Sequence, residues 1–143
     1  MTDIYAVDAT LLQYENKVWL FANVKEQGGS SLDALHLFYA PQGLITDEWT
    51  PHSRNPVVKD IHSARPAGRI FMQDGKLIRP SQDSSRRYGY ALRFNCITKL
   101  DENEYAEETE STFKPAGGRI LATHTFNQAG GLTVIDAIIR RRK

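Results

Sequence analysis

Residues 7–24 read VDATLLQY-EN-KVWLFANV, two apolar-rich runs separated by the dipeptide Glu15-Asn16. Two such runs joined by a short polar turn predict a β-hairpin. Successive side chains of a strand point to opposite faces, so Leu20 lies on one face of the second strand while Trp19 and Phe21 lie on the other. Because both faces are apolar, we expect this strand to be covered on two sides in the interior of the protein.

The rest of the chain repeats this pattern of short apolar runs between turn-forming residues. Asp74-Gly75 separates two further runs and is a strong signal for a hairpin turn. In 88–97 large apolar or aromatic side chains alternate with small or polar ones, which places Tyr88 and Tyr90 on one face of a strand. The β-branched residues of 132–139 favour a strand over a short helix. The sequence therefore predicts an all-β fold with strands at 7–14, 17–24, 33–40, a short piece near 48–50, 68–72, 76–80, 88–97, 104–112, 120–126 and 132–139.

The predicted strands recur in units, as they do in the blades of a β-propeller. The stretches Ala6-Val7-Asp8-Ala9 and Ala64-Arg65-Pro66-Ala67 are 58 residues apart, and a hairpin follows each. We expect a single domain built as a partial β-propeller, with two four-stranded antiparallel blades (1–60 and 61–121) and the start of a third (122–143). A closed ring needs about four blades or more. The open blade faces therefore predict a homo-oligomer, most simply a two-fold dimer.

The composition limits the class of protein. The chain has 143 residues, of which 41% are hydrophobic and 24% charged, and its net charge is +1. These values fit one globular domain and exclude a uniformly basic chain that coats nucleic acid. A single cysteine, Cys96, excludes an internal disulfide. No apolar run approaches the roughly 20 residues that span a bilayer, and the start lacks signal-peptide features, so we expect a cytoplasmic protein without a membrane partner.

The charges are unevenly distributed along the chain. Residues 54–93 carry nine cations against three acids, whereas 101–110 carry six acids and no cation. Two interpretations stay open: the charged strand faces offset one another, or the arginines of the middle segment line an anion-accepting cleft. The neutral average charge, and the lack of interleaved basic and aromatic runs outside 86–94, count against nucleic acid as a partner.

Hairpin geometry also predicts where a site lies. The start of a hairpin's first strand and the end of its second strand lie at the same end, so Asp8, Arg65 and His124 are expected on one rim, with Asp83 close to Arg65. Paired carboxylates above an aromatic floor suit sugar hydroxyls and glycosidic chemistry, and arginine suits phosphate. Structural roles, such as a turn-capping Asp83, are the alternative. The candidate catalytic residues are Asp8 and Asp83, and the candidate ligand-binding residues are Arg65, Arg79, Gln82, Tyr88, Arg93 and His124.

Several common chemistries have no motif in this sequence. It contains no Gly-x-x-x-x-Gly-Lys-Ser/Thr phosphate loop, no Gly-x-Gly-x-x-Gly fingerprint, no Gly-x-Ser-x-Gly elbow and no Cys-x-x-Cys pair. The spacing of His36, His52, His62 and His124 fits no standard metal motif. We therefore predict that the protein uses neither a metal ion nor a cofactor.

Several longer stretches resemble consecutive segments of one known domain. The most specific are Ala64-Arg65-Pro66-Ala67-Gly68 and Arg79-Pro80-Ser81-Gln82-Asp83, and they are joined by Trp49-Thr50-Pro51-His52 and residues 88–95. Over nearly its whole length, the chain resembles the N-terminal five-bladed propeller domain of glucosamine inositolphosphorylceramide transferases and its bacterial relatives. That domain is similar in fold to furanosidase and arabinanase-type glycoside hydrolases. The resemblance implies recognition of a sugar or glycoconjugate at a central cavity.

Three functions follow from these observations. In the first, an oligomeric partial propeller binds a sugar or sugar phosphate without turnover; the related hydrolases use three carboxylates from three blades, and here Arg65 stands where the second unit would supply one. In the second, the protein is a glycosyl-transferring or glycoside-hydrolysing enzyme whose site is assembled between subunits, with Asp8 and Asp83 as acid and base. In the third, the arginine-rich middle segment binds nucleic acid.

Overall fold

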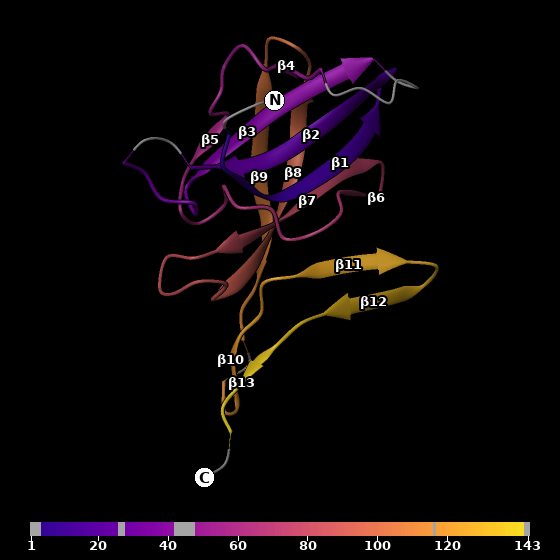
Figure 1. Cartoon of the computed structure of the whole chain (residues 1–143). Coiled ribbons are helices and arrows are strands. Elements are labelled where there is room, and N and C mark those ends of the chain that lie inside the picture. Colours follow the sequence, from indigo (N-terminus) through magenta and orange to yellow (C-terminus); the bar gives the residue numbers. More distant parts are fainter. Residues whose placement is uncertain (1–3, 26–27, 42–47, 116, 142–143) are drawn as a thin grey trace.

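The computed structural model describes residues 4–25, 28–41, 48–115 and 117–141, and its regular elements there are all β-strands. They form two large and two small sheets, and every strand pairing is antiparallel (Figure 1). The predicted all-β class is therefore confirmed. Over these described ranges, no helix has the length and apolar character needed to cross a membrane.

The first large sheet is built on the hairpin that opens the chain. Glu15 and Asn16 form its turn with φ values of 47° and 60°, the left-handed conformation that a tight hairpin turn needs. Residues 19–22 of the second strand are at most 9% exposed, so this strand is covered on both faces as its sequence predicts. The strands are β1 (Ala6–Tyr14), β2 (Lys17–Val24) and β3 (Ala34–Pro41), with β4 (Thr50–Pro51) and β5 (Val58–Lys59) both paired to the free edge of β3.

The second large sheet follows the same plan, with strands paired in chain order. Its first hairpin turns at Asp74-Gly75, where the sequence predicts the turn, and an isolated bridge between Pro66 and Ser81 extends the pairing of the hairpin toward its open end. The strands are β6 (Phe71–Gln73), β7 (Lys76–Asp83), β8 (Ala91–Leu100) and β9 (Tyr105–Phe113).

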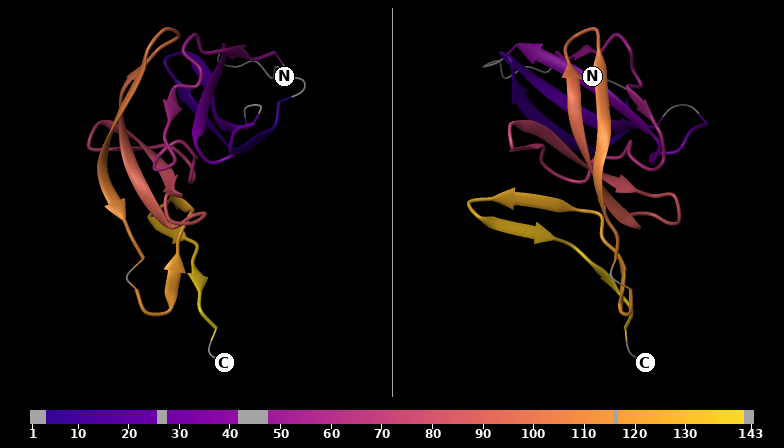
Figure 2. Two further views of the ribbon diagram at one scale, coloured as in Figure 1. Left: turned by 90° about the vertical axis from the view of Figure 1, so that its left-hand side faces the viewer. Right: turned by 180° about the vertical axis from the view of Figure 1, so that it is seen from behind.

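The chain ends in a long, interrupted hairpin. Its turn is Gly130-Gly131, and breaks at 123–125 and 136–137 divide it into two short ladders. Both views in Figure 2 show the ladder farther from this turn, here called the outer ladder, projecting away from the two large sheets. The inner ladder pairs β11 (Phe126–Ala129) with β12 (Leu132–Ile135), and the outer ladder pairs β10 (Ile120–Ala122) with β13 (Ile138–Ile139).

The core lies between the two large sheets. One face of the first sheet contributes aromatic and leucine side chains, and the second sheet packs aliphatic side chains against them. Burial of such side chains is the main source of stability, at about 1.5–3 kcal/mol for each large one. A smaller aromatic contact docks the C-terminal hairpin, because Phe126 packs against Phe71 and Phe94 at ring distances of 5.6 and 4.9 Å. The buried core residues are Trp19, Phe21, Leu35, Leu37, Ala64, Ile70, Leu77, Ile97 and Leu100.

The bounds of several predicted strands are wrong. The strand predicted at 88–97 starts only at Ala91, because residues 84–90 form a loop; Tyr88 and Tyr90 therefore do not share a strand face with Leu92. The two C-terminal strands, predicted as continuous, are each broken in the middle. The strand predicted at 76–80 runs on to Asp83, because Pro80 keeps an extended conformation within the β7–β8 ladder.

Candidate functional site

Asp8 occupies a strained position at the open end of the first hairpin. The register of β1 against β2 shifts between Val7 and Thr10, which marks a β-bulge, and Asp8 within it has a φ of 53°. Positive φ is uncommon for residues other than glycine, and aspartate and asparagine tolerate it best. Bulges commonly redirect a side chain, and here the carboxylate points toward the second sheet.

Two residues of the segment 61–121 hold the Asp8 carboxylate. Arg65 donates a hydrogen bond of 2.5 Å from Nε to Asp8 Oδ2, and Gln82 donates one of 3.1 Å from Nε2 to the same oxygen. Arg65 also binds the carbonyl oxygen of Ser31, and Gln82 also binds that of Pro66. Both side chains are therefore fixed by further contacts, so the carboxylate is oriented before any ligand arrives.

Aromatic and imidazole groups complete the rim. The Arg65 guanidinium lies 4.8 Å from the centre of the Tyr88 ring, and the centres of the Tyr88 and His124 rings are 5.2 Å apart in an edge-to-face arrangement. His124 Nδ1 contacts the Asp136 carboxylate, whose other oxygen accepts the backbone N–H groups of His124 and Thr125.

These side chains surround a hollow of about 230 Å³. The buried Oε1 atom of Gln82 has no hydrogen-bond partner among the described residues, and it provides a further acceptor at this place. A second hollow, of about 520 Å³, shares Ala9, Thr10 and Gly68 with the first and runs on to Arg69 and Asn127. The lining of the first hollow comprises Asp8, Ala9, Thr10, Pro66, Ala67, Gly68, Gln82, Tyr88, His124 and Thr125.

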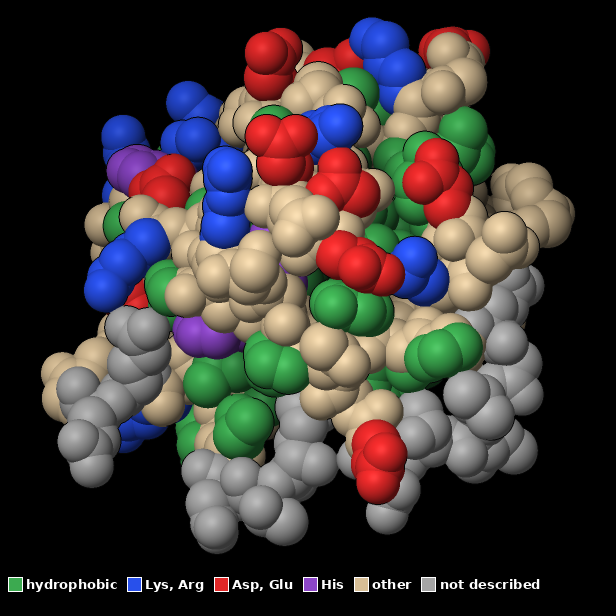
Figure 3. Space-filling model, turned by 90° about the horizontal axis from the view of Figure 1, so that it is seen from above, with side chains coloured by type: hydrophobic (Ala, Val, Ile, Leu, Met, Phe, Trp, Pro, Cys, Tyr) green, Lys and Arg blue, Asp and Glu red, His purple; other side chains and the backbone are tan. Residues whose placement is uncertain are grey.

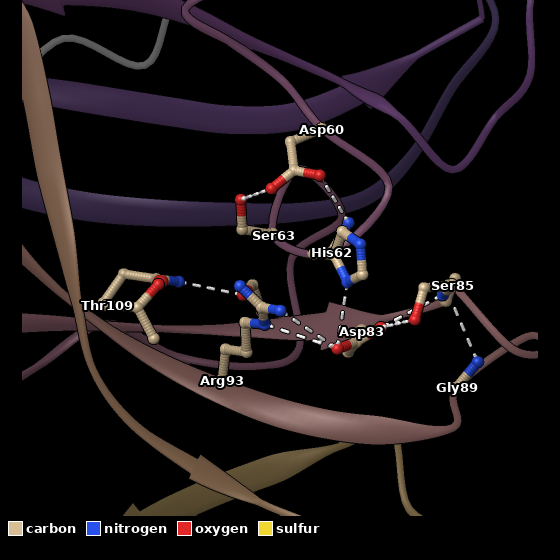
Figure 4. A network of polar contacts seen from close by, with 11 residues as sticks. Asp60, His62, Ser63, Asp83, Ser85, Gly89, Arg93 and Thr109 are labelled. Carbon is tan, nitrogen blue, oxygen red and sulfur yellow. Dashed lines mark hydrogen bonds and ion pairs between the residues drawn. The ribbon is translucent and has the colours of Figure 1, made fainter.

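Asp83 lies outside this hollow. It follows Gln82 directly on β7, so its side chain points to the opposite face of the strand. There it accepts hydrogen bonds from the backbone N–H and Oγ of Ser85, contacts His62 Nδ1 at 3.3 Å and receives Arg93 Nε at 3.3 Å (Figure 4). Asp60 extends the network, because its carboxylate accepts the His62 N–H and the Ser63 hydroxyl.

This network fixes the charge of Asp83. Burial disfavours the ionised carboxylate, but the hydrogen bonds from Ser85 and the contact with His62 outweigh that effect, so the pKa of Asp83 lies below its ordinary value. Asp8 and Asp83, expected as one pair of carboxylates on the rim, therefore occupy two separate environments. Arg93 belongs to the Asp83 network and not to the hollow of Asp8.

Arg79 is also separated from the rim. Its side chain is 1% exposed and binds Glu107 of β9 through two hydrogen bonds of 2.5 and 2.7 Å. Tyr105 donates its hydroxyl to the same carboxylate, and Arg79 donates to the carbonyl oxygen of Ser63. Burial opposes the guanidinium charge, but the attraction of Glu107 exceeds this effect and raises the pKa of Arg79. Arg79 is thus part of the interior of the second sheet.

The acidic segment of the sequence is largely neutralised in space. Lys17 pairs with Glu102, Lys99 with Asp101 and Glu104, and Lys76 with Glu110. Figure 3 shows acidic and basic side chains interspersed on the upper face of the molecule. On this face, acidic and basic side chains therefore offset one another, which is the first of the two interpretations of the charge pattern. The described part of the chain also brings no three His, Cys, Asp or Glu side chains together as a metal site.

The structure thus brings together five of the eight candidate residues, and it adds one that sequence reasoning missed. The five are Asp8, Arg65, Gln82, Tyr88 and His124. The missed residue is Asp136, which holds His124 across the break between β12 and β13. An acid flanked by apolar strand residues, as in Val134-Ile135-Asp136-Ala137-Ile138, is the signal that would have marked it.

The described residues place the chain in the class of all-β domains built from antiparallel sheets, with one polar hollow lined by residues of both large sheets and of the C-terminal hairpin. Within that class, residues 2–119 match the family described as glucosamine inositolphosphorylceramide transferase 1, N-terminal, and the chain belongs to this family. It is 36% identical over 104 residues to proteins of that name from Oryza sativa subspecies japonica and indica, and 35% identical to the one from Arabidopsis thaliana. The resemblance seen in the sequence is confirmed.

The match covers most of this chain and a small part of those relatives. The aligned residues make up 71% of the chain, but only 14% of either Oryza protein and 13% of the Arabidopsis protein. The chain therefore corresponds to part of the N-terminal region of much longer proteins. No solved structure matches it.

Proposed function

We propose that the protein is a binding module for a sugar or sugar phosphate, and that it binds without turnover in the hollow around Asp8. The observation that carries the proposal is the Asp8 carboxylate, held by Arg65 and Gln82 so that it faces a hollow with Tyr88 and His124 on its wall. Charged acceptors fixed by neighbouring donors form the strongest hydrogen bonds to hydroxyl groups. An aromatic ring beside such acceptors suits the apolar face of a sugar.

The number of carboxylates favours binding over hydrolysis. Glycoside hydrolysis ordinarily needs two carboxyl groups that flank the scissile bond. Among the described residues that line the hollow, Asp8 is the single carboxylate, while Asp83 is occupied by Ser85, His62 and Arg93. A glycosyl-transferring or hydrolysing enzyme would need a further acid from outside this hollow. The transferase activity in the names of the longer relatives belongs to those proteins.

A partial propeller is the architecture that best explains why these residues meet. The sheets β1–β5 and β6–β9 would be the first and second blades, in 1–60 and 61–121, and the C-terminal hairpin in 122–143 would begin a third. In a propeller the starts of the innermost strands converge around the axis. Asp8, Arg65 and His124 each stand at such a start. Arg65 binds Asp8 directly, and Tyr88 contacts both Arg65 and His124, which supports this arrangement.

The adjoining hollow suits a ligand larger than one sugar ring. It continues from Thr10 and Gly68 to Arg69, whose guanidinium has no partner among the described residues. An unpaired arginine in a groove wall suits phosphate, which it binds through two parallel hydrogen bonds. The ligand class we propose is therefore a sugar that carries a phosphate or another anionic substituent.

A titration followed by ¹H–¹⁵N NMR tests the proposal with two probes, glucosamine and myo-inositol 1-phosphate. We expect shifts at the amides of residues 8–10, 67–69 and 124–125. Asp8→Asn, which keeps the shape and tolerates positive φ, should weaken binding by about tenfold because it removes the charge. Asp74→Asn is the matched control, since Asp74 has a φ of 50° in an exposed turn outside the hollow. The absence of shifts with both probes, or equal effects of the two variants, overturns the proposal.

A further inference from the structure

The outer edge of β12 in the C-terminal hairpin is open, whereas the outer edge of β11 is bonded at its start, where the Phe126 N–H donates to the Ala67 carbonyl oxygen. β12 pairs with β11 on one side, and no described strand pairs with its other side. All four residues of β12 are exposed, with Leu132 at 65% and Val134 at 53%. A two-stranded hairpin is marginally stable by itself in water, and a third strand or a packing partner stabilises it. Phe126 packs this hairpin against Phe71 and Phe94, and the edge of β12 stays open to a further strand.

The edges of the molecule differ in charge. The outer edge strand of the second large sheet, β9, carries Glu108 and Glu110, and charged side chains on an edge prevent pairing with another chain. The hairpin from 126 to 135 carries no charged residue. Two copies of β12 can therefore approach each other without like charges, whereas two copies of β9 would bring glutamates together.

We propose that β12 pairs with β12 of a second copy of this chain across a two-fold axis. The two hairpins then form one four-stranded antiparallel sheet, in the order β11-β12-β12-β11. That is the number of strands in the sheet β6–β9. An antiparallel edge pairing is self-complementary, as a two-fold dimer requires. The inference concerns assembly and does not depend on the ligand of the Asp8 hollow.

The turn geometry limits the registers that this pairing can take. Gly130 and Gly131 have φ values of 55° and 79°, which gives a two-residue turn closed by a hydrogen-bonded pair, Ala129 and Leu132. The backbone groups of Thr133 and Ile135 then point outward from the hairpin. Opposite residues of an antiparallel ladder are either both hydrogen-bonded or both not. The register that pairs Thr133 with Ile135 of the second copy meets this rule and uses both outward-facing residues of each β12. Val134 consequently faces Val134 of the second copy on the axis.

The interface extends beyond the strand edge. A stable dimer buries about 800 Å² on each partner, and four residues of backbone supply only part of that area. Next to the edge lies a hollow of about 230 Å³ lined by Arg69, Asn127, Gln128, Ala129, Leu132 and Val134. Apolar exposure continues along the hairpin at Ile135, Ile138 and Ile139, which are 46, 44 and 54% exposed. Side chains of the second copy fill this hollow and cover these residues.

Sedimentation velocity of the full chain over a range of concentrations tests whether it dimerises. We expect a dimer that Val134→Lys and Thr133→Pro each weaken by at least about tenfold, since the lysines would face each other and the proline would lack the outward N–H. Met72→Lys is the matched control, because Met72 is 60% exposed and points to the face of β6 opposite Phe71, the residue that contacts the hairpin. A monomer at all concentrations overturns the proposal, as does a dimer that all three variants leave unchanged.

A cross-linking experiment tests the register. In a Cys96→Ser background, Val134→Cys places two thiols opposite each other on the axis, at a separation that a disulfide can span. Mild oxidation should link this variant into covalent dimers, while Met72→Cys should stay unlinked. Hydrogen exchange adds a readout that involves no substitution, because the amides of Thr133 and Ile135 should become protected as the concentration rises. A dimer in which these amides exchange freely and Val134→Cys stays unlinked overturns the proposed edge.

Discussion

Asp8 and Arg65 are 57 positions apart in the sequence, yet Arg65 Nε donates a hydrogen bond of 2.5 Å to Asp8 Oδ2. The Arg65 side chain is 11% exposed and that of Asp8 36%, so the pair lies partly inside the molecule. Arg65 also binds the Ser31 carbonyl oxygen and lies over Tyr88. The Arg65 guanidinium thus connects β1 of the first sheet, the loop between β2 and β3, and the loop between β7 and β8.

The first prediction follows from this geometry. Arg65→Lys keeps the positive charge but loses the fork of donors and the flat face that lies over Tyr88. We expect the free energy of unfolding to fall by about 1–2 kcal/mol, measured by urea denaturation. Arg54→Lys is the control, since the Arg54 side chain is 65% exposed and lies 3.9 Å from Glu104. Equal stability of the two variants would show that Arg65 acts as a simple point charge.

Hairpin geometry explains which part of this site the sequence could predict. A hairpin fixes which ends of its strands lie together, and that rule placed Asp8, Arg65 and Gln82 at one rim. Val7 does pair with Asn23, and Gln82 N–H does bind the Arg65 carbonyl oxygen. The rule concerns the ends of strands and not the direction of side chains. Asp83 was therefore placed on the correct end of β7 but on the wrong face.

Contacts between distant strands account for what the sequence could not predict. The sequence predicts Arg79 at the rim, but the side chain binds Glu107, which lies two strands away on β9. His124 was expected at the rim, but its partner Asp136 depends on a break in a strand that the apolar pattern of 132–139 predicted to be continuous. Strand periodicity reports burial, and it is silent on which polar groups meet across a sheet.

The second prediction concerns the Arg79–Glu107 pair. Removing one partner of a buried ion pair leaves an uncompensated charge, at a cost of about 3–5 kcal/mol. We therefore expect Glu107→Gln to lower the free energy of unfolding by that amount in denaturant titrations. Glu108→Gln, on the exposed side of the same strand, should leave stability unchanged.

The double variant Arg79→Met/Glu107→Leu separates the charge from the packing. It replaces both partners with apolar side chains, which often stabilise as well as the pair they replace. We expect it to recover most of the stability that Glu107→Gln loses. If the double variant is less stable than the single one, hydrogen bonds such as that from Tyr105 contribute more to the free energy of unfolding than the ion pair does.

The third prediction concerns acid stability. Because the pKa of Asp83 is lowered in the folded protein, its stabilising contribution is complete above the ordinary value of 3.8 and is lost as pH falls through the lower folded-state value. Asp83→Asn should therefore be less stable than the parent protein at neutral pH, and the difference should shrink toward pH 2. Free energies of unfolding measured over this pH range for both proteins test the sign. A difference independent of pH would mean that the hydrogen bonds of Asp83, and not its charge, hold the network.

The fourth prediction concerns the glycine at which the C-terminal hairpin docks. Gly68 has a φ of 135°, and a Cβ atom there would lie 1.9 Å from the carbonyl oxygen of Phe126, whose N–H binds the Ala67 carbonyl oxygen at 2.7 Å. Gly68→Ala therefore has to displace the backbone of Phe126, whose ring packs on Phe71 and Phe94. We expect it to cost about 2 kcal/mol more than Gly75→Ala and to speed amide exchange over residues 126–129. Gly75 is the control, because its φ of 77° is also positive while a Cβ atom would meet open space. Equal effects of the two substitutions would show that backbone conformation alone, and not the contact with Phe126, requires glycine at position 68.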